Sequence, residues 1–375
     1  MHPAIVQPQH GSTTWRTVIE LEFQMLSNRL IHLTAWTVAM LLGGAQPCAV
    51  AQSASVRGAG ATFPYPIYAE WAAQYHQETG GVVSFEPVGS SLGVEQIARR
   101  LVDFGASDTP LGPDELRRLD VLQFPAVIGG VVPVVNVPGI KPGALRLTGA
   151  VLANIYRGTV RKWSDQAIAG LNPALNLPDS NITVVHRSDS SGTTFLWSEF
   201  LSRSSPPWKS QPGTGNVLAW PAGVGAKGNE GMASLVQRTR LSIGYVEYAY
   251  AKRHGLTHAN VRNQAGEFVS PGKDSFAAAA AAVSWHAASD LDQTLVDAPG
   301  EGSWPIAGAS FILIGMSEAD VKGSREAIRF FDWAFRQGGP AAARLDYAPL
   351  PAPAAALVVQ LWADRFSHSG VRRER

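Results

Sequence analysis

Two long apolar segments constrain the fold of this chain more than any other feature of its sequence. They are 124-FPAVIGGVVPVVNV-137 and 304-WPIAGASFILIG-315, which lie about 180 residues apart and each contain Gly or Pro partway along. If both segments pass from one lobe to another, the chain forms two lobes joined by two crossovers, with a ligand-binding cleft between them. If both are ordinary buried strands, they belong to a single sheet. The pattern alone leaves both arrangements open.

Strand-like and helix-like stretches alternate along the chain, which predicts an α/β architecture. The expected strands are 81–88, 124–137, 181–187, 241–248 and 304–315. The expected helices are 65–78, 92–101, 149–158, 193–203 and 323–338. The last helix has a one-sided apolar stripe, at Ile328, Phe331, Ala334 and Phe335, that is suited to packing on a sheet. The alanine run 276–283 would suit a helix or a surface insertion.

The first 51 residues are typical of an export signal rather than of a folded domain. Arg29 supplies a charged region, and the apolar stretch 30–42 is shorter than the ~18 residues of a membrane span. A small–x–small triplet that signal peptidase recognises ends at Ala51. We expect a signal peptide over 25–51, cleavage after Ala51, and an upstream extension over 1–24.

The only cysteine, Cys48, lies inside this predicted leader. The exported chain would therefore contain no disulfide, no reactive thiol and no cysteine-ligated metal. Two alternatives are lipid attachment at Cys48 and an uncleaved membrane anchor. Pro47 directly before the cysteine disfavours the first, and the short apolar run disfavours the second.

The charge balance argues against a function that depends on a strong overall field. The formal net charge is +1 and only 16% of the residues are charged. Nucleic acids and anionic membrane surfaces are therefore not expected as partners.

Three loops rich in Gly, Ser and Thr each lead into a predicted helix and form the candidate binding site. They lie in 58-GAGATFPYPIYAEW-71, 89-GSSLGVEQI-97 and 184-VVHRSDSSGTTFLWSEF-200. Their notable residues are Gly58, Gly60 and Thr62, then Ser90 and Ser91, then Ser191, Gly192 and Thr193. We expect Gly58 and Gly60 to relax the backbone, Thr62 to cap its helix, and both serines of the second loop to precede theirs. Helix N-termini offer free N–H groups to an anion, although a single loop of this kind is equally a well-capped helix.

Charged residues at two predicted strand ends refine this hypothesis. Arg187 would add a full positive charge, and Asp189 could hold its guanidinium through a bidentate pair. Asp108, in 102-VDFGASDTP-110, would repel an anion unless that anion still carries a proton. Hydrogen phosphate carries one and sulfate does not, so an acceptor at Asp108 would reject sulfate. The alternatives are a surface pair for Arg187 and Asp189 and a turn residue for Asp108.

Taken over the whole chain, the sequence resembles the substrate-binding proteins of phosphate ABC transporters (PstS). The resemblance runs from about Val56 to Trp362 with order and spacing kept. It rests on the runs GAGATFPYPIY, GSSLGVEQI, VDFGASDTPL, FPAVIGGVVPVVNVPG, RSDSSGTTF, GNEGMASLVQ, IGYVEYAYAK, WPIAGASFILI and FFDWAF.

The resemblance implies a two-lobed periplasmic binding protein of type II, with mixed sheets flanked by helices and two crossover strands forming a hinge. Lobe I would comprise residues 52–130 and 304–375, and lobe II residues 131–303. It further implies a monomer in the periplasm that binds inorganic phosphate without a cofactor. The expected partners are the permease and ATPase subunits of a phosphate ABC transporter.

The resemblance also implies a set of phosphate ligands. Carried over residue by residue, they are Thr62, Phe63 (through its backbone N–H), Ser90, Asp108, Arg187, Ser191, Gly192 and Thr193. Asp108 would accept the phosphate proton and Asp189 would brace Arg187, with no catalytic residue and no metal. Departures from the family pattern lie beside these positions, at Leu92, His186 and Ser190.

Two enzymatic alternatives and one generic one remain beside a phosphate receptor. Gly223, Gly225 and Gly228 satisfy G-x-G-x-x-G with Glu247 about 20 residues on, as a dinucleotide site requires, but Trp220-Pro221 before them is not a clean buried strand. A secreted phosphate-ester hydrolase could use Ser191 as nucleophile if a base or a metal lay within reach. A generic oxyanion receptor would bind sulfate as well.

Overall fold

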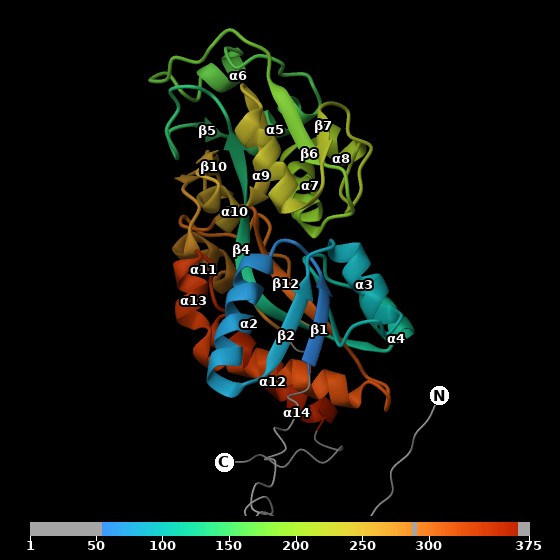
Figure 1. Cartoon of the computed structure of the whole chain (residues 1–375). Helices are drawn as coiled ribbons and strands as arrows, with labels where there is room; N and C mark the ends of the chain where they lie inside the picture. Colours follow the sequence, from blue (N-terminus) through green and yellow to red (C-terminus); the bar gives the residue numbers. More distant parts are fainter. Residues whose placement is uncertain (1–54, 287–290, 367–375) are drawn as a thin grey trace, which may run out of the picture. The chain divides into compact units, whose positions relative to one another are not determined.

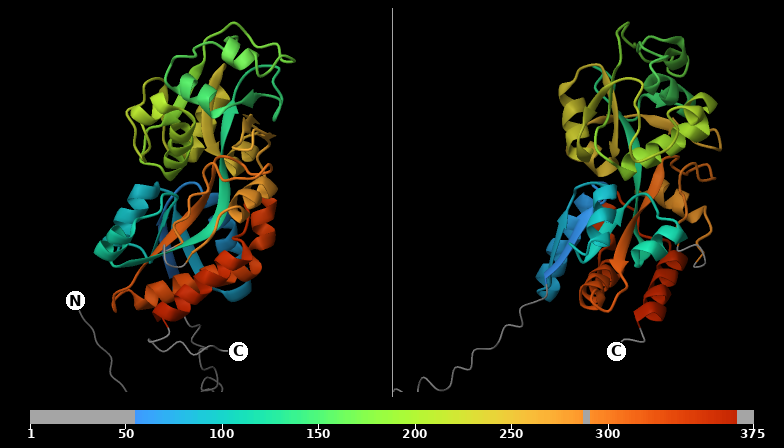
Figure 2. Two further views of the ribbon diagram at one scale, coloured as in Figure 1. Left: turned by 180° about the vertical axis from the view of Figure 1, so that it is seen from behind. Right: turned by 90° about the vertical axis from the view of Figure 1, so that its right-hand side faces the viewer.

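One long strand, β4 (Val121–Val135), runs through the whole fold, and every one of its residues is buried. Residues Val121–Gly130 pair antiparallel with β12 (Ala307–Gly315), and Val131–Val135 pair antiparallel with β8 (Ser242–Glu247). Figures 1 and 2 show β4 passing from one group of strands and helices into the other in every view. The strand therefore belongs to two lobes at once.

The computed structural model describes residues 55–286 and 291–366, which lie in one compact unit, Ser53–Arg375. The predicted extension, signal peptide and cleavage site fall outside the described residues and stay predictions. None of the described helices is long and apolar enough to cross a membrane.

The main sheet is mixed. Within the described residues its strands run in the order β2-β1-β3-β12-β4-β8-β6-β7, with β9 paired to β4. Strands β2, β1 and β3 are parallel to one another, as are β8, β6 and β7, whereas β12 and β4 run antiparallel to their neighbours. The remaining strand bounds are β1 (Ser55–Gly60), β2 (Val82–Glu86), β3 (Phe104–Ser107), β6 (Thr183–Arg187), β7 (Val224–Ala226) and β9 (Thr257–His258). A small second sheet contains β5 (Arg146–Leu147), β10 (Asn260–Arg262) and β11 (Phe268–Val269).

Helices flank both parts of the main sheet (Figure 1). Those outside the segment from β4 to β12 are α2 (Tyr65–Thr79), α3 (Ser90–Ala98), α4 (Pro113–Leu119), α12 (Val321–Gln337), α13 (Gly339–Arg344) and α14 (Ala352–Phe366). Those between β4 and β12 are α5 (Gly149–Tyr156), α6 (Gln166–Ala169), α7 (Gly192–Ser204), α8 (Pro206–Ser210), α9 (Gly228–Arg238), α10 (Tyr248–Arg253) and α11 (Lys273–Ala281). The first group packs on β1–β3, β12 and the beginning of β4 as the first lobe. In the second group α7 and α9 pack on the sheet around β8 as the second lobe, whereas α11 packs on β4 and β12. The predicted α/β architecture with two lobes is confirmed.

A proline inside the central strand is accommodated by an irregularity. Pro125 has no N–H to give to the ladder, so it is tolerated in a sheet only at an edge or a bulge. The register between β4 and β12 shifts at this place, where Ser310 pairs with Val127 and Phe311 pairs with Pro125. The bulge therefore allows β4 to continue past Pro125, the first of the two prolines in the strand.

The core of the first lobe is built around the apolar face of α12. Phe331 and Ala334 are buried as the sequence predicted, whereas Ile328 and Phe335 are only partly buried. The Phe331 ring packs edge-on against four other aromatic rings, those of Tyr68, Phe104, Phe124 and Phe330. The alanine run of the sequence lies in α11, with Phe276, Ala279 and Ala280 buried.

Three glycines of the main sheet permit close packing, and the expectation about two of them was wrong. Gly58 and Gly60 do not relax a loop but lie in β1. A Cβ on Gly58 would overlap the Phe104 ring at 2.0 Å, and Gly60, with φ +145°, lies against the Ala106 carbonyl. Gly129 of β4 leaves room for the Phe63 ring in the same way, since a Cβ there would come within 2.7 Å of it. The sheet is thus shaped to receive the first of the three loops.

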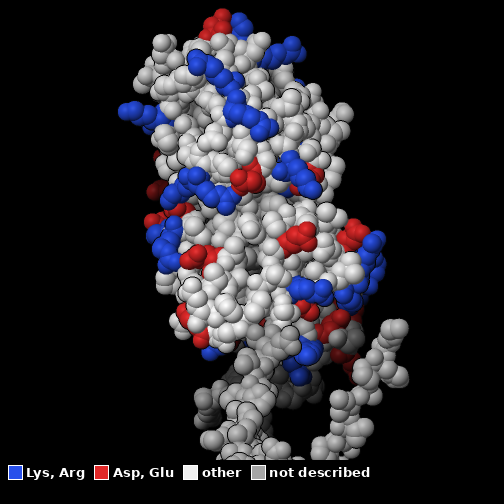
Figure 3. All heavy atoms as spheres, in the orientation of Figure 1, with Lys and Arg blue, Asp and Glu red and all other residues white. Residues whose placement is uncertain are grey.

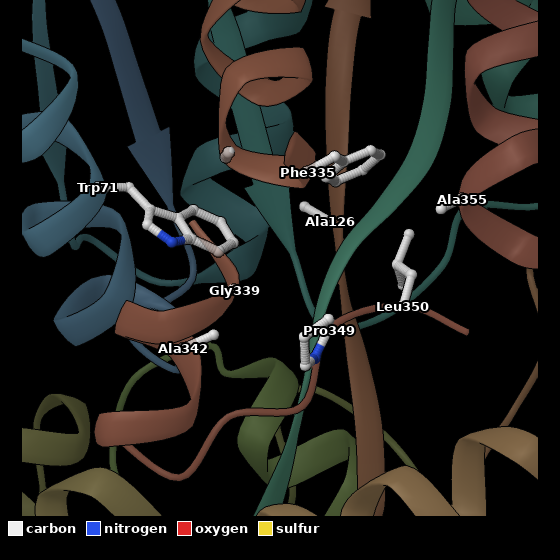
Figure 4. Close-up of a pocket in the computed structure, with 9 residues that line it drawn as sticks. Trp71, Ala126, Phe335, Gly339, Ala342, Pro349, Leu350 and Ala355 are labelled. Carbon is white, nitrogen blue, oxygen red and sulfur yellow. The ribbon is translucent and has the colours of Figure 1, made fainter. Parts of the chain in front are cut away.

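A small apolar cavity lies in the first lobe, away from these loops (Figure 4). Its volume is about 40 Å³, and side chains from α2, β4, α12, α13 and α14 surround it. Its lining consists of Trp71, Ala126, Ala334, Phe335, Gly339, Ala342, Pro349, Leu350 and Ala355. The one polar side-chain group among them, the Trp71 N–H, already donates to the Gly338 carbonyl at 2.9 Å. Such a lining offers nothing to replace the hydration of an anion.

Replacing Phe331 by alanine should lower the free energy of unfolding by about 3–5 kcal/mol, because it removes a ring packed among four others and leaves a cavity. Urea unfolding followed by circular dichroism measures the change. The matched control is Arg329→Ala on the exposed face of the same helix, which should change stability by less than about 0.5 kcal/mol. Equal losses in the two variants would contradict the assignment of Phe331 to the core.

Candidate functional site

The first loop places Thr62 and Phe63 between β1 and α2. Phenol groups hold both carbonyls: Tyr250 donates to the Thr62 carbonyl at 2.7 Å, and Tyr347 donates to the Phe63 carbonyl at 2.7 Å. The prediction that Thr62 caps the helix was wrong. Pro64 occupies the N-cap position, and the Thr62 hydroxyl is used elsewhere. The loop is therefore fixed from its carbonyl side.

The second loop turns Ser90 toward the third loop. Gly89 is the N-cap of α3, so Ser90 and Ser91 lie in its first turn rather than before it, contrary to expectation. The Ser90 Oγ accepts hydrogen bonds from the backbone N–H groups of Asp108, at 3.3 Å, and Gly192, at 3.1 Å. Because its oxygen accepts from both, the serine retains its hydroxyl hydrogen for a further acceptor.

The third loop begins α7. Ser191 is its N-cap, and the Ser191 hydroxyl accepts a hydrogen bond from the backbone N–H of Thr194 at 3.1 Å. Gly192 follows in a space that no larger residue could fill. A Cβ there would lie 2.6 Å from both the Asp108 Cβ and the Ser90 Oγ. The start of α7 therefore approaches the end of β3 and the start of α3 closely.

Arg187 and Asp189 form the predicted bidentate pair. Arg187, at the end of β6, is only 2% exposed. Its Nε donates to Asp189 Oδ1 at 2.7 Å and its Nη2 to Oδ2 at 2.6 Å. Burial raises the pKa of Asp189, but the Arg187 guanidinium outweighs that effect and the pKa is lowered overall. The third guanidinium nitrogen, Nη1, is buried without a partner among the described residues.

Asp108 directly follows β3 and is 1% exposed. Neither of its carboxyl oxygens makes a well-formed hydrogen bond to a described residue, although the Ser310 hydroxyl lies close by. Burial raises the pKa of Asp108 to about 7, with Ser310 and the positive charge of Arg187 opposing that rise. The site therefore combines an unpaired carboxyl group and an unpaired guanidinium N–H in one buried space.

Hydrogen bonds between the lobes bring the predicted residues together. Ser90 bonds to Gly192, and the Ser91 and Ser190 hydroxyls bond to each other. Thr109 donates to the side chain of Asn216 at 2.6 Å. The structure thus groups the three loops, Asp108 and Arg187, which sequence reasoning could propose only one by one.

Two of the departures from the family pattern lie outside this group. His186 stacks on Trp220 with ring centroids 4.8 Å apart, and burial lowers its pKa. This agrees with the expectation that the histidine points away from Arg187. Leu92 is 44% exposed on α3.

Sequence reasoning missed Asn229, the second residue of α9. Its side-chain amide donates to Thr62 Oγ1 at 2.8 Å and to Thr193 Oγ1 at 3.1 Å, so it joins two predicted ligands from different lobes. The only local signal was its place in 223-GVGAKGNEGM-232, the stretch that contains the glycine triplet of a possible dinucleotide motif. Tyr250 and Tyr347 were missed as well, and no local pattern marks them.

The glycine triplet does not form a dinucleotide site. Gly225 lies in the short strand β7, and the N–H of Gly228 donates to Asp189 Oδ1 at 3.1 Å. Glu247 is fully buried instead of facing a ligand. Its Oε2 accepts from the Ala249 N–H at 2.9 Å and contacts the Tyr347 hydroxyl at 2.8 Å. Burial raises the pKa of Glu247 to about 8.

The described residues show no cluster that could hold a metal ion, taking three or more His, Cys, Asp or Glu side chains as the requirement. His254 and His258 have the H-x-x-x-H spacing, but they do not share a helix face. His254 is the C-cap of α10, with its Nε2 2.8 Å from Glu230, and His258 lies in β9.

The surface beside Thr62 carries charges of both signs. A cavity of about 590 Å³ opens beside Thr62 and is also lined by Lys227, Glu230 and Arg253. Arg253 pairs with Glu230 there. On the face shown in Figure 3, basic and acidic side chains are likewise interspersed. The positive charge that would attract an anion into the site is therefore that of the buried Arg187 guanidinium.

Comparison with known proteins gives the family. The model of the PBP superfamily domain matches residues 46–337. The chain is 49% identical over 312 residues to the phosphate-binding protein PstS of Haemophilus influenzae, covering 83% of this chain and 93% of the relative. It is 50% identical over 300 residues to the protein of the same name from Pasteurella multocida, covering 80% and 87%.

Solved structures agree on the fold. A high-affinity periplasmic phosphate-binding protein, PfluDING, determined with bound phosphate, superimposes with a TM-score of 0.65 at 21% identity, covering 82% of this chain and 93% of that one. The phosphate-binding protein of Stenotrophomonas maltophilia gives a TM-score of 0.56 at 20% identity, with coverages of 82% and 93%. The two-lobed binding-protein fold inferred from the sequence is confirmed.

The buried Glu247 predicts a pH dependence of stability in phosphate-free buffer. Its folded-state pKa is raised to about 8, so the proton it binds stabilises the folded chain fully below the unfolded value near 4.5. That contribution to the free energy of unfolding, on the order of a few kcal/mol in total, is lost as the pH rises through about 8. Glu247→Gln cannot lose a proton and should show a flatter dependence.

Urea unfolding of parent and variant at intervals from pH 5 to pH 9 tests this expectation. Asp108, whose pKa is also raised, titrates in both proteins and cancels in their difference. If the two stability curves run parallel over the whole range, Glu247 is not the titrating group.

Proposed function

We propose that this chain, which belongs to the PBP superfamily and to its PstS phosphate-binding proteins, binds inorganic phosphate in the cleft between its lobes and delivers it to a phosphate ABC transporter. The observation that carries the proposal is the pairing of two buried groups without partners, the Asp108 carboxyl and the Arg187 Nη1. A buried guanidinium N–H requires a hydrogen-bond acceptor, and a carboxylate requires a donor. A protonated oxyanion satisfies both at once.

In this proposal, donors from both lobes replace the hydration shell of the phosphate. The proposed ligands are Thr62, the Phe63 N–H, Ser90, Arg187, Ser191, Gly192 and Thr193. Asp108 accepts the phosphate proton, and Asp189 holds Arg187 in place. A desolvated anion is stable in such a site only because each of its oxygens is hydrogen-bonded. Sulfate would leave Asp108 buried against an oxygen without hydrogen, and arsenate, which is protonated and similar in size, would not be excluded.

The proposed ligands belong to two lobes that meet at the crossover strands. We assign residues 52–130 and 304–375 to lobe I and residues 131–303 to lobe II, with the hinge where β4 passes between them. Closure of the lobes on phosphate is then a hinge motion, and the closed surface is what a transporter would recognise. The assignment is supported by the change of β4 partner from β12 to β8 at Val131.

The same family membership supports export. We propose that residues 25–51 direct the chain to the periplasm and are removed after Ala51. There it would act as a monomer on the permease and ATPase subunits of the transporter, without a cofactor. Immunoblotting of periplasmic and membrane fractions, with N-terminal sequencing of the product, tests this; an uncleaved chain in the membrane fraction would contradict it.

Binding without turnover is favoured over a hydrolase that uses Ser191. The Ser191 hydroxyl caps α7, and none of the described histidines forms a hydrogen bond with it. The nearest histidine in sequence, His186, has its Nδ1 3.0 Å from the Arg187 carbonyl and its ring on Trp220. A general base must reach its nucleophile within hydrogen-bond distance, directly or through one water.

Titration calorimetry on the chain from Gln52, refolded to remove bound ligand, tests the proposed function. We expect one-to-one phosphate binding, no detectable sulfate binding at pH 8, and no hydrolysis of a phosphate ester. Equal binding of sulfate would leave a generic oxyanion receptor. Ester hydrolysis that disappears in Ser191→Ala would make the protein an enzyme.

Asp108→Asn should lower the ratio of phosphate to sulfate affinity by at least about tenfold, since an amide can donate to sulfate and a carboxylate cannot. Lowering the pH should also lower the ratio of phosphate to sulfate affinity in the parent protein. Because burial raises the pKa of Asp108 to about 7, a growing fraction of the carboxyl is protonated below that pH and can donate to sulfate. If Asp108→Asn rejects sulfate as well as the parent does, Asp108 is not the proton acceptor.

Gly192→Ala should weaken phosphate binding by about 100-fold or more, because its Cβ would hold the lobes apart by overlapping Asp108 and Ser90. Gly231→Ala is the matched control, since a Cβ there meets its neighbours at 3.8 Å or more. The control should bind phosphate as the parent does. Unchanged affinity in Gly192→Ala would show that this close approach is not needed for binding.

A further inference from the structure

Asn229 is fully buried at the start of α9 and contacts a threonine from each lobe. Its Nδ2 lies 2.8 Å from Thr62 Oγ1 and 3.1 Å from Thr193 Oγ1. Its backbone N–H also points to Thr62 Oγ1, at 3.4 Å. Both threonines are phosphate ligands in the proposed function, whereas Asn229 itself is not among those ligands.

The orientation of the Asn229 amide follows from its other contact. The backbone N–H of Glu247 lies 2.9 Å from the side-chain Oδ1. A backbone N–H can only donate, so the amide atom that faces it must be the oxygen. The NH₂ group therefore faces the two threonines and donates to both.

This orientation determines what the threonine hydroxyls can do. Each Oγ1 accepts a hydrogen bond from Asn229, and Thr62 Oγ1 accepts from the backbone N–H as well. Neither hydroxyl hydrogen has a protein acceptor among the described residues. Each hydroxyl is thus left to act as a donor, which is the role that an oxyanion requires.

We propose that Asn229 is a positioning residue that fixes the hydrogen-bond polarity of the cleft by making Thr62 and Thr193 donors toward the anion from opposite lobes. The inference rests on the proposed function and deepens it. Without the amide, either hydroxyl could rotate and offer a lone pair to the anion, which repels it. Ordering of both hydroxyls before the ligand arrives reduces the cost of binding.

The anchor of Asn229 connects this role to the crossover region. Glu247 ends β8, where it pairs with Val131, the first β4 residue beyond the β12 ladder. Thr62 follows β1 of the first lobe, and Thr193 lies in the first turn of α7 in the second. One amide held at the crossover therefore reaches ligands from both lobes only when these are together.

Asn229→Asp tests the proposal with an isosteric change. The variant keeps an oxygen for the Glu247 N–H and replaces the donating NH₂ by an acceptor. With inorganic phosphate as the probe, we expect its dissociation constant at pH 8.5 to rise by about 100-fold or more relative to the parent. The variant-to-parent ratio should shrink as the pH falls to 5.5, because a protonated carboxyl can donate again.

The ratio is used because titration of phosphate itself affects both proteins equally. Other ionisable groups around the contact are common to both proteins. They are Asp108, Arg187, Asp189, Glu230, Glu247, Tyr250 and Tyr347. The matched control is Asn172→Asp, at a buried asparagine that also donates and accepts backbone hydrogen bonds but lies outside the cleft. The control should lose stability without a pH-dependent change in phosphate affinity.

A second measurement keeps the proposal testable if Asn229→Asp does not fold. Asn229→Ala should weaken phosphate binding about tenfold in the parent but less than about threefold in a Thr62→Val/Thr193→Val background, where no hydroxyl remains to orient. Equal losses in both backgrounds would overturn the proposal, as would a pH-independent or less than threefold effect of Asn229→Asp. Failure of the parent itself to bind phosphate would instead overturn the proposed function.

Discussion

The buried guanidinium of Arg187 is the constraint on which the rest of the site depends. A lone charge in the interior of a protein is very costly, and a single partner compensates it only when the geometry is good. Asp189 supplies that partner through two parallel hydrogen bonds, and the N–H of Gly228 steadies Asp189 in turn. The pair occupies the Nε–Nη2 edge of the guanidinium and leaves Nη1 without a partner among the described residues. The positive charge is thus oriented before any ligand arrives.

Three phenol groups hold the loops around this charge. Tyr245 accepts the Arg187 N–H at 3.2 Å and bonds to Thr194 of α7 at 2.7 Å. Tyr250 and Tyr347 hold the carbonyls of Thr62 and Phe63. Each phenol presents an apolar ring to the core and a polar end to the backbone, as buried tyrosines commonly do. The loops that lead into α2 and α7 are consequently fixed in position before a ligand arrives.

The mixed sheet explains how one chain can bring these loops together. Strands β1, β3 and β6 all lead into the site, and Asp108 and Arg187 directly follow or end such strands. Strand β4 carries the chain from one lobe into the other, so the hydrogen bonds across the cleft join parts far apart in the sequence. The bonds from Gly192 to Ser90 and from Asn229 to Thr62 are of this kind. Interlobe bonds such as these give a closed state its specific geometry.

Local features of this protein can be predicted from its amino-acid sequence. Period and composition predicted β4, β12 and the amphipathic face of α12, because burial of apolar side chains imposes those patterns on neighbouring residues. The spacing of Arg187 and Asp189 predicted their ion pair, because opposite charges two residues apart can reach each other whatever the rest of the fold does. Helix starts were located to within a few residues, but Thr62 and Ser90 were given wrong positions at them, because capping depends on the exact backbone conformation.

The contacts between distant groups follow from the tertiary structure. Asn229 lies 167 residues from Thr62, and no local pattern records a contact over that separation. The tertiary structure also decided that Glu247 is a buried structural carboxyl, since burial is a property of the packed chain and not of a motif.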